Sequence, residues 1–405
     1  MKSGILALPN TVKVLFVGML LSSIGNGMGA PFVSLFLTMR IGLSMGWSGT
    51  LMSLMAVGFV VSMSVGGYLS DRFPPWRILV ISLLCSTAAY VGLGFSTEPI
   101  GAAACLLGVG LSGFSAGSLS KLLVMSVTPE ERPTVFGGQY LMVNIGLGVG
   151  ATCGGLIATK WGYTYAFLIN AATFLAYLVV VIALRRSLTA APTHSEGVRA
   201  PGGYMRIVRD RRFLPLAIGV VLVSTAGFAQ LESGVPMLTT RYPHVSAAAV
   251  GIAWTANTIA IAVAQVPMIA LIKKIGNRAA VIAGATCFAL SWVLLFAGLT
   301  LGLPGVLAMC SSFVVFGLGE TLFMPSSNSL VNDLSDDEHR GRYNAATSTL
   351  YAAGDMVGPL VAGFVLTGAP IIWVITMVGL LLVALVSFTR VRPVVDNDGW
   401  DRVVS

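Results

Sequence analysis

Twelve apolar stretches, each long enough to cross a lipid bilayer, constrain this chain more than any other feature. A membrane span needs roughly 20 consecutive apolar residues. The stretches do not alternate apolar and polar residues with a period of two, as barrel strands do, so we interpret them as helices. They cover approximately residues 12–37, 47–69, 77–97, 100–126, 135–158, 162–184, 213–240, 247–272, 278–300, 304–332, 342–367 and 370–390. The sequence therefore predicts an all-α membrane protein with twelve transmembrane helices.

The distribution of charge predicts how the chain is oriented in the membrane. Only 10% of the residues are charged, whereas a soluble domain usually carries about 25%. If the N-terminus is cytoplasmic, 21 of the 24 Lys and Arg residues fall at cytoplasmic helix ends and loops, and the exceptions are Arg40, Lys160 and Arg241. This positive-inside bias predicts a multi-pass protein of the plasma (inner) membrane with both termini in the cytoplasm. It also explains the net charge of +8 without a nucleic-acid partner.

One long polar connection divides the chain. Residues 185–212 read RRSLTAAPTHSEGVRAPGGYMRIVRDRR and are basic and rich in Pro and Gly. Within them, YMRIVRDRRF is expected to form a short amphipathic helix along the membrane surface. The predicted parts are an N-terminal six-helix bundle over 1–184, a cytoplasmic linker over 185–212, and a C-terminal six-helix bundle with a short cytoplasmic tail over 213–405.

The two halves repeat each other at an offset of 208 residues. The matching pairs include Glu130 and Glu338, Arg132 and Arg340, Gly146 and Gly354, Gly150 and Gly358, and Gly155 and Gly363. Span five therefore repeats as span eleven. A duplicated six-helix unit with parallel halves is typical of transporters that bind their substrate near the membrane midplane, between the halves.

Small residues mark one face of spans five and eleven. Gly146, Gly150 and Gly154 recur every four residues, as do Gly354, Gly358 and Ala362. Because small residues let helices approach closely in lipid, we expect the halves to pack along these faces. Pro359 lacks a backbone N–H and is expected to bend span eleven. The complete predicted glycine seam is Gly146, Gly150, Gly154, Gly155, Gly354, Gly358, Pro359 and Gly363.

Three motifs resemble those of the major facilitator superfamily. The run GLGVGATCGG (146–155) resembles the antiporter motif G-P-x-x-G-G, with Ala151 in place of Pro. GYLSDR (67–72) resembles the loop motif G-x-x-x-D-R, although Pro74, Pro75 and Trp76 depart from it downstream. DDEHRGRY (336–343) resembles the segment that leads into span eleven. The chain is thus similar to the twelve-span drug:proton antiporters, which implies two pseudo-symmetric six-helix bundles in the major facilitator fold.

The loop motif predicts a latch between the halves on the cytoplasmic side. The carboxylate of Asp71, together with Gly67 and Arg72, is expected to face the start of span eleven. Free N–H groups there, and Arg340 or Arg342, favour negative charge. Such a latch stabilises the outward-facing state and breaks for inward opening. The alternative is that Asp71 only keeps a tight loop in water.

Three acids lie inside predicted spans, and all are in the C-terminal half: Glu232, Glu320 and Asp355. A charge at mid-membrane costs about 2.5–3.5 kcal/mol on insertion scales. At 1.5 Å per residue, Asp355 lies about 20 Å from the cytoplasmic start of its helix, near the midplane. Glu232 is expected nearer the outside and Glu320 nearer the cytoplasm. We predict Asp355 as the proton site, with Glu320 and Glu232 as competitors, although each could instead make a structural hydrogen bond.

Span four departs from the drug:proton antiporters. Many of them carry an arginine there that is associated with proton coupling, but residues 108–117 read GVGLSGFSAG and hold no charge. Either the coupling groups lie elsewhere or the protein is not proton-coupled. Polar and large apolar side chains within other spans are candidates to line a substrate cavity, or alternatively to pack helices together. They are Asn26, Met28, Phe32, Gln139, Tyr140, Asn144, Phe228, Gln230, Trp254, Asn257, Phe323 and Met324.

These features predict a secondary active transporter that exports small apolar or cationic compounds in exchange for protons. The competing hypotheses are transport of a sugar, peptide, siderophore or lipid-like metabolite, an uncoupled facilitator, or a membrane-embedded ligand sensor. No G-x-x-x-x-G-K-[ST] loop is present to bind ATP, and no nucleophile or metal-ligand set indicates an enzyme. We expect no cofactor and no metal, with a small-molecule substrate and membrane lipid as partners of a functional monomer.

Overall fold

The structure is a computed structural model that describes residues 8–189, 210–243, 245–335 and 339–391. Within these ranges every regular element is helical. Eleven helical stretches have the length and apolar composition of a membrane span. The 26-residue helix α16 (Arg340–Val365), which carries Asp355, is a further membrane-length helix but is less apolar than those eleven. The prediction of an all-α multi-pass membrane protein is confirmed, with twelve membrane-length helical stretches in the described part of the chain.

The first half contains six of these stretches. The first is broken into α1 (Asn10–Gly29), η2 (Ala30–Phe32), α2 (Val33–Leu35) and η3 (Phe36–Arg40). The fourth is broken into α5 (Pro99–Leu111), η4 (Ser112–Ser115) and α6 (Ala116–Met125). The others are α3 (Met45–Arg72), α4 (Pro75–Phe95), α7 (Arg132–Trp161), which follows the short η5 (Pro129–Glu131), and α8 (Tyr163–Thr189).

The second half also contains six stretches, but its fourth, α15 (Gly305–Asp333), is unbroken. Its first stretch is broken into α10 (Phe213–Val223), η6 (Ser224–Phe228), α11 (Ala229–Glu232) and α12 (Gly234–Thr239). The others are α13 (Ala247–Ile275), α14 (Asn277–Thr300), α16 and α17 (Pro370–Thr389). Helices α7 and α16 begin at Arg132 and Arg340, which are 208 residues apart, so the repeat seen in the sequence is also a repeat of helix boundaries.

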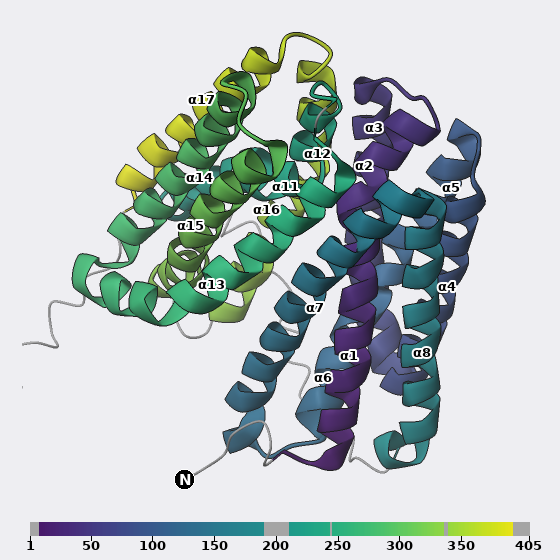
Figure 1. Cartoon of the computed structure of the whole chain (residues 1–405). Coiled ribbons are helices and arrows are strands. Elements are labelled where there is room, and N and C mark those ends of the chain that lie inside the picture. The colour runs from purple at the N-terminus through teal and green to yellow at the C-terminus, as the bar shows by residue number, and fades with distance from the viewer. Residues whose placement is uncertain (1–7, 190–209, 244, 336–338, 392–405) are drawn as a thin grey trace, which may run out of the picture.

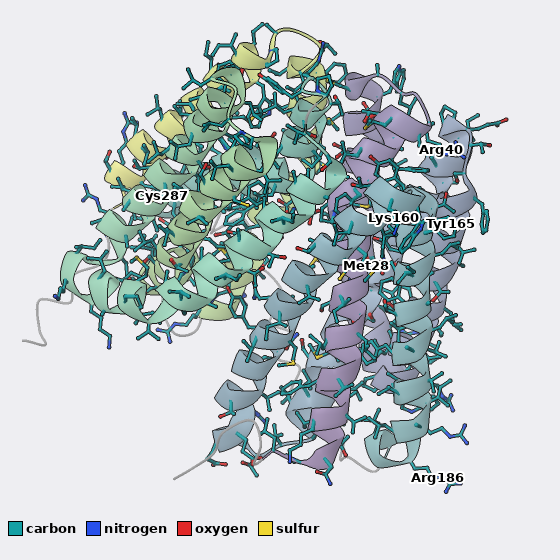
Figure 2. All side chains as sticks on the ribbon, viewed as in Figure 1. Met28, Arg40, Lys160, Tyr165, Arg186 and Cys287 are labelled. Carbon is teal, nitrogen blue, oxygen red and sulfur yellow. The ribbon has the colours of Figure 1, made fainter. Side chains whose placement is uncertain are left out.

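The two groups of helices form two bundles that meet at one end and diverge toward the other (Figure 1). We call the diverging end, where α8 ends at Thr189 and α10 begins at Phe213, the linker side, and the opposite end the far side. Arg186 lies on the linker side, whereas Arg40 and Lys160 lie toward the far side (Figure 2). This placement agrees with the charge bias in the sequence. Residues 190–209, which hold most of the predicted linker and amphipathic helix, lie outside the described residues.

The expectation that the glycine seam joins the two halves is wrong for most of its members. A Cβ added at Gly154 would lie 2.6 Å from Cα of Met28 in α1, and Gly146 and Gly150 also face α1 of their own half. Gly354 faces Ser224, and Gly358 faces Ala229, again within one half. These glycines hold span five against span one, and span eleven against span seven.

Different small residues make the contact between the halves. A Cβ at Gly155 in α7 would lie 2.6 Å from the carbonyl oxygen of Ala247 in α13. On the other flank, a Cβ at Gly49 in α3 would meet the carbonyl oxygen of Pro359, and one at Gly363 would lie 3.1 Å from Cα of Gly49. Thus Gly155, Pro359 and Gly363 do lie between the halves, and all three belong to the far side.

Candidate functional site

A cavity of about 590 Å³ lies between the two halves. Helices α3 and α5 form its N-terminal wall, while the span-seven elements η6 and α11 join α13, α15 and α16 in the C-terminal wall. Pro359 lines the cavity and also contacts Gly49, so the far-side contact between α3 and α16 closes the cavity at that end. The halves diverge on the linker side, which makes this a transporter-like arrangement with the cavity closed toward the far side (Figure 1).

All three membrane-embedded acids line this one cavity. Glu232 is the last residue of α11, Glu320 lies in α15 and Asp355 lies in α16. The sequence placed them at different depths, which suggested separate roles, but the fold brings them to a shared space. Asp355 also lies close enough to Glu232 for the two carboxylates to interact electrostatically. The cavity therefore holds a concentration of potential negative charge supplied by one half alone.

Asp355 has a more polar environment than its apolar sequence neighbours suggest. Its side chain is exposed on the cavity wall, and its Oδ1 lies 2.7 Å from the hydroxyl oxygen of Ser224. The same hydroxyl lies 2.8 Å from the carbonyl oxygen of Tyr351. A hydrogen bond, the alternative left open by the sequence, is therefore present at Asp355, with Ser224 as the partner. The Asp355 carboxylate therefore faces the cavity while the hydrogen bond from Ser224 fixes its orientation.

Irregular backbone in span seven positions Ser224 and Glu232. Helix α10 continues into a π-helical turn, η6, and the helix breaks again at Ser233 (φ −116°, ψ −71°) directly after Glu232. π-helical turns occur frequently at functional sites. A membrane helix can be broken where the backbone groups that are freed line a cavity or form hydrogen bonds with side chains. The π-helical turn places Ser224 against Asp355, and the break places Glu232 at the cavity wall.

Gln230 braces this irregular segment. Its Nε2 donates to the carbonyl oxygens of Thr225 (2.7 Å) and Gly358 (3.2 Å), and its Oε1 accepts from Nε1 of Trp373 (2.9 Å). The side chain is completely buried and is not part of the cavity lining. The prediction that Gln230 lines the cavity is therefore wrong, and the structure shows a hydrogen-bonding link between spans seven, eleven and twelve.

Two of the remaining cavity candidates reach the cavity, namely Phe228 and Trp254. Met28 and Phe32 are buried under Gly154, and Phe323 packs against the ring of Phe288. Because their side chains are buried in helix packing, the prediction that these three line the cavity is wrong. Others outside the lining are Asn26, Gln139, Tyr140, Asn144, Asn257 and Met324.

Two of these residues nevertheless lie beside the acids. Asn257 is buried in α13 near Glu320, and its Oδ1 has no hydrogen-bond partner among the described residues. Tyr140, an exposed residue of α7 in the other half, lies close enough to Glu320 for an electrostatic interaction. Glu320 thus has polar neighbours from both halves, although neither residue belongs to the cavity wall.

Sequence reasoning missed every residue of the N-terminal wall, and also Ala229, Leu231, Ser348, Tyr351 and Ala352 of the C-terminal wall. Met52, Met55, Phe59 and Met63 of α3 line the cavity, as do Val109 and Gly110 of α5. The α3 residues recur at intervals of three and four, so they share one helix face. That spacing was visible in the sequence. In a helix that is apolar on every side, however, it does not distinguish a cavity face from a lipid face.

The predicted latch residues occupy two helix ends on the linker side. Gly67, Asp71 and Arg72 lie in the last turns of α3, not in a loop as the motif suggested, because the helix continues to Arg72. The Arg72 guanidinium lies 4.4 Å from the centre of the Tyr68 ring. Arg340 and Arg342 lie in the first turn of α16. A latch between these two ends stays a prediction for the state in which the linker side is closed.

A cluster of threonine hydroxyls reinforces the far-side contact. The Thr255 hydroxyl in α13 donates to the carbonyl oxygen of Gly148 in α7 and is hydrogen-bonded to the Thr152 hydroxyl. The Thr152 hydroxyl oxygen also lies 3.2 Å from the carbonyl oxygen of Gly251, which is the alternative acceptor for its proton. The backbone N–H of Ala248 donates to the Thr159 hydroxyl (3.1 Å). We call Thr152 and Thr255 the threonine clasp. The clasp bonds the two halves directly across the far side.

Known proteins resemble this chain over most of its length. The family model described as Major Facilitator Superfamily matches residues 15–244 and 233–399. An MFS-type transporter of Bacillus subtilis (strain 168), YttB, is 24% identical over 360 residues, covering 88% of each chain. A Na(+), Li(+), K(+)/H(+) antiporter of Planococcus maritimus is 24% identical, covering 86% of this chain and 88% of its own. Multidrug resistance protein 1 of B. subtilis (strain 168) is 21% identical, covering 87% and 89% respectively.

Solved structures share the fold at lower identity. The crystal structure of the peptide transporter POT in complex with sulfate superposes with a TM-score of 0.79 at 16% identity. The match covers 96% of this chain and 95% of that one. At this identity the likeness concerns the arrangement of the helices.

Proposed function

Because the chain belongs to the Major Facilitator Superfamily of secondary transporters, we propose that it exports small apolar or cationic compounds in exchange for protons. The family membership makes it a transporter rather than an enzyme, with a small-molecule substrate. It is a multi-pass integral membrane protein. We place it in the plasma membrane with the linker side in the cytoplasm, as the distribution of Lys and Arg favours. The described conformation is then inward-facing.

One observation carries the proposal: the cavity between the halves gathers Glu232, Glu320 and Asp355, and no basic residue belongs to its lining. Carboxylates that face a water-filled cavity can bind either a cation or a proton. If the cavity closes around an ionised carboxylate with neither, the charge is stranded at mid-membrane at a cost of about 2.5–3.5 kcal/mol. This cost disfavours passage of an empty, charged cavity from one side to the other.

The cost of closing the cavity around an uncompensated charge couples the movement of substrate to the movement of protons. With the cavity open to the cytoplasm, a cationic substrate binds to the ionised acids and allows the cavity to close. After the far-side contact opens, external protons replace the substrate, and the neutralised cavity returns inward. Alternating access therefore proceeds with either substrate or protons bound, and a proton gradient biases the cycle toward export. Asp355 is the first candidate proton site because it is exposed to the cavity and oriented by Ser224.

Two of the relatives support export of cationic compounds over transport of a sugar or an anionic metabolite. One is named as a multidrug resistance protein and the other as a cation/proton antiporter. Both names describe the relatives: one concerns resistance to drugs, and the other concerns exchange of cations for protons. An acidic cavity in this chain agrees with positively charged cargo more directly than with neutral or negatively charged cargo.

The test is uphill transport in vesicles with an imposed pH gradient. We expect the wild-type protein to accumulate tetraphenylphosphonium against its concentration gradient, and Asp355→Asn to lose this while retaining downhill exchange. Glu98→Gln, at an exposed position before α5 and outside the cavity, is the matched control and should transport normally. If Asp355→Asn still accumulates the cation uphill, the role passes to Glu320 and then Glu232. If accumulation of tetraphenylphosphonium by the wild-type protein does not depend on the pH gradient, the proposed exchange of substrate for protons is wrong.

A further inference from the structure

The two walls of the central cavity differ in chemistry. The C-terminal wall carries the three acids, whereas the N-terminal wall consists of Met52, Met55, Ala56, Phe59, Met63, Val109 and Gly110 and holds no ionisable group. A ligand that touches both walls therefore meets carboxylates on one side and thioethers with an aromatic ring on the other. The asymmetry follows the boundary between the two halves of the chain.

Four side chains of the N-terminal wall form a continuous apolar face, which we call the methionine face: Met52, Met55, Phe59 and Met63. Steps of three and four residues keep them on one side of α3, facing the cavity. The end of this face nearer the linker side is open to a ligand, since Phe59 and Met63 are 44% and 47% exposed. Met52 is 3% exposed and forms the closed end.

The backbone beneath the methionine face is held firmly. A Cβ at Gly58 would lie 3.0 Å from the carbonyl oxygen of Leu107 in α5, and one at Gly110 would meet the carbonyl oxygen of Met55. Backbone contact on this flank fixes the rotation of α3. The methionine side chains themselves are unbranched and polarizable, so they adapt to ligands of different shape. A fixed helix with adaptable side chains suits recognition of varied apolar bodies.

We propose that the substrate is an organic cation with an apolar body, bound with its charge toward Glu232, Glu320 and Asp355 and its body against the methionine face. The methionine face then selects which apolar bodies are carried, and the acids select for positive charge. This inference rests on the proposed function, because it deepens the account of the same cavity. It adds Met52, Met55, Phe59 and Met63 as residues that determine specificity.

Equilibrium binding to the purified protein separates the two selections. Tetraphenylphosphonium and tetraphenylborate have the same shape and opposite charge, whereas tetraethylammonium keeps the positive charge on a smaller aliphatic body. Trp254 lines the cavity, so its fluorescence can report binding. No gradient is needed, and the result does not depend on whether the protein couples transport to protons.

Shortening the methionine face should weaken binding of the large cation selectively. We expect Met55→Ala with Met63→Ala to weaken tetraphenylphosphonium binding about tenfold, with less than about a twofold change for tetraethylammonium. Met55→Leu with Met63→Leu restores apolar volume and should bind tetraphenylphosphonium nearly as the wild type does. Val57→Ala with Val61→Ala, at exposed α3 positions outside the cavity lining, is the matched control and should change neither cation.

Neutralising the acids should have the complementary effect. The wild-type protein should prefer the phosphonium to the borate. Glu232→Gln with Glu320→Gln and Asp355→Asn should remove that preference while retaining binding of both ions, which also shows that the variant is folded. Equal binding of the two ions by the wild type, or equal weakening of both cations by the methionine variants, refutes the inference. Failure of uphill transport alone refutes only the proton exchange proposed above.

Discussion

Replacing Thr255 with Val should shift the protein away from the conformation described here. Valine has nearly the shape of threonine, so the α7–α13 packing is retained, but it has no hydroxyl. The substitution removes the bond to the Gly148 carbonyl oxygen and the bond to the Thr152 hydroxyl. At about 0.5–1.5 kcal/mol for each hydrogen bond, the far-side-closed state loses about 1–3 kcal/mol, a shift of about 5- to 150-fold in the conformational equilibrium.

Distances across the far side measure this shift. Ile100 and Leu301 lie in different halves at far-side helix ends, and each is 81% exposed, so both tolerate a spin label. The five native cysteines are free and must first be replaced. We expect double electron–electron resonance to show a larger population at long distance in the Thr255→Val protein than in the wild-type background.

The control removes a hydroxyl of the same kind that bonds within one helix. Thr286 in α14 donates only to the carbonyl oxygen of Ile282 (2.9 Å), so Thr286→Val should leave the distances unchanged. An unchanged distance distribution in Thr255→Val would falsify the idea that the threonine clasp stabilises far-side closure. A shift toward shorter distance would contradict it as well.

Three further perturbations test other contacts. Asp71→Asn should slow transport in vesicles while the protein remains folded and inserted, and a normal rate means that no latch involving Asp71 operates. Gln230→Leu leaves the buried hydrogen-bond partners of Gln230 in spans seven, eleven and twelve unpaired. It should lower the free energy of unfolding by about 2–4 kcal/mol, measured as a lower Tm. An unchanged Tm would contradict the stabilising role of Gln230. Gly155→Leu should open the far side in the spin-label assay, because Gly155 packs between the halves. Gly150→Leu should mainly lower Tm, because Gly150 packs within one half. Identical effects of the two substitutions would contradict this difference in packing.

The broad architecture was predictable because lipid imposes it on the sequence. Long apolar runs must be helical in a bilayer. The predicted spans 135–158 and 342–367 fall within helices that begin a few residues earlier, at Arg132 and Arg340. Asp355 and the other embedded acids were identifiable because a carboxylate is costly in lipid. Their convergence on one cavity depends on the π-helical turn and the helix break in span seven. No local sequence pattern predicted either of these two features.

The orientation of helix faces was the part that sequence could not supply. Gly150 and Gly155 lie in one helix and read alike, yet one packs against α1 and the other against α13. A single periodic pattern shows that a helix is approached closely, but not by which neighbour. The methionine face was missed for a related reason, since apolar side chains suit a cavity, a core and lipid equally well.

Pro359 has a pharmacological consequence, since it belongs both to the cavity wall and to the far-side contact with Gly49. A compound that fills the cavity up to Pro359 rests against the contact that must separate for the far side to open. A rigid compound that also binds α3 would tie the two halves together across that contact. Such a compound acts as a wedge inhibitor: it occupies the cavity but is not carried. In the spin-label measurement it should raise the far-side-closed population, whereas a transported compound should let both states exchange.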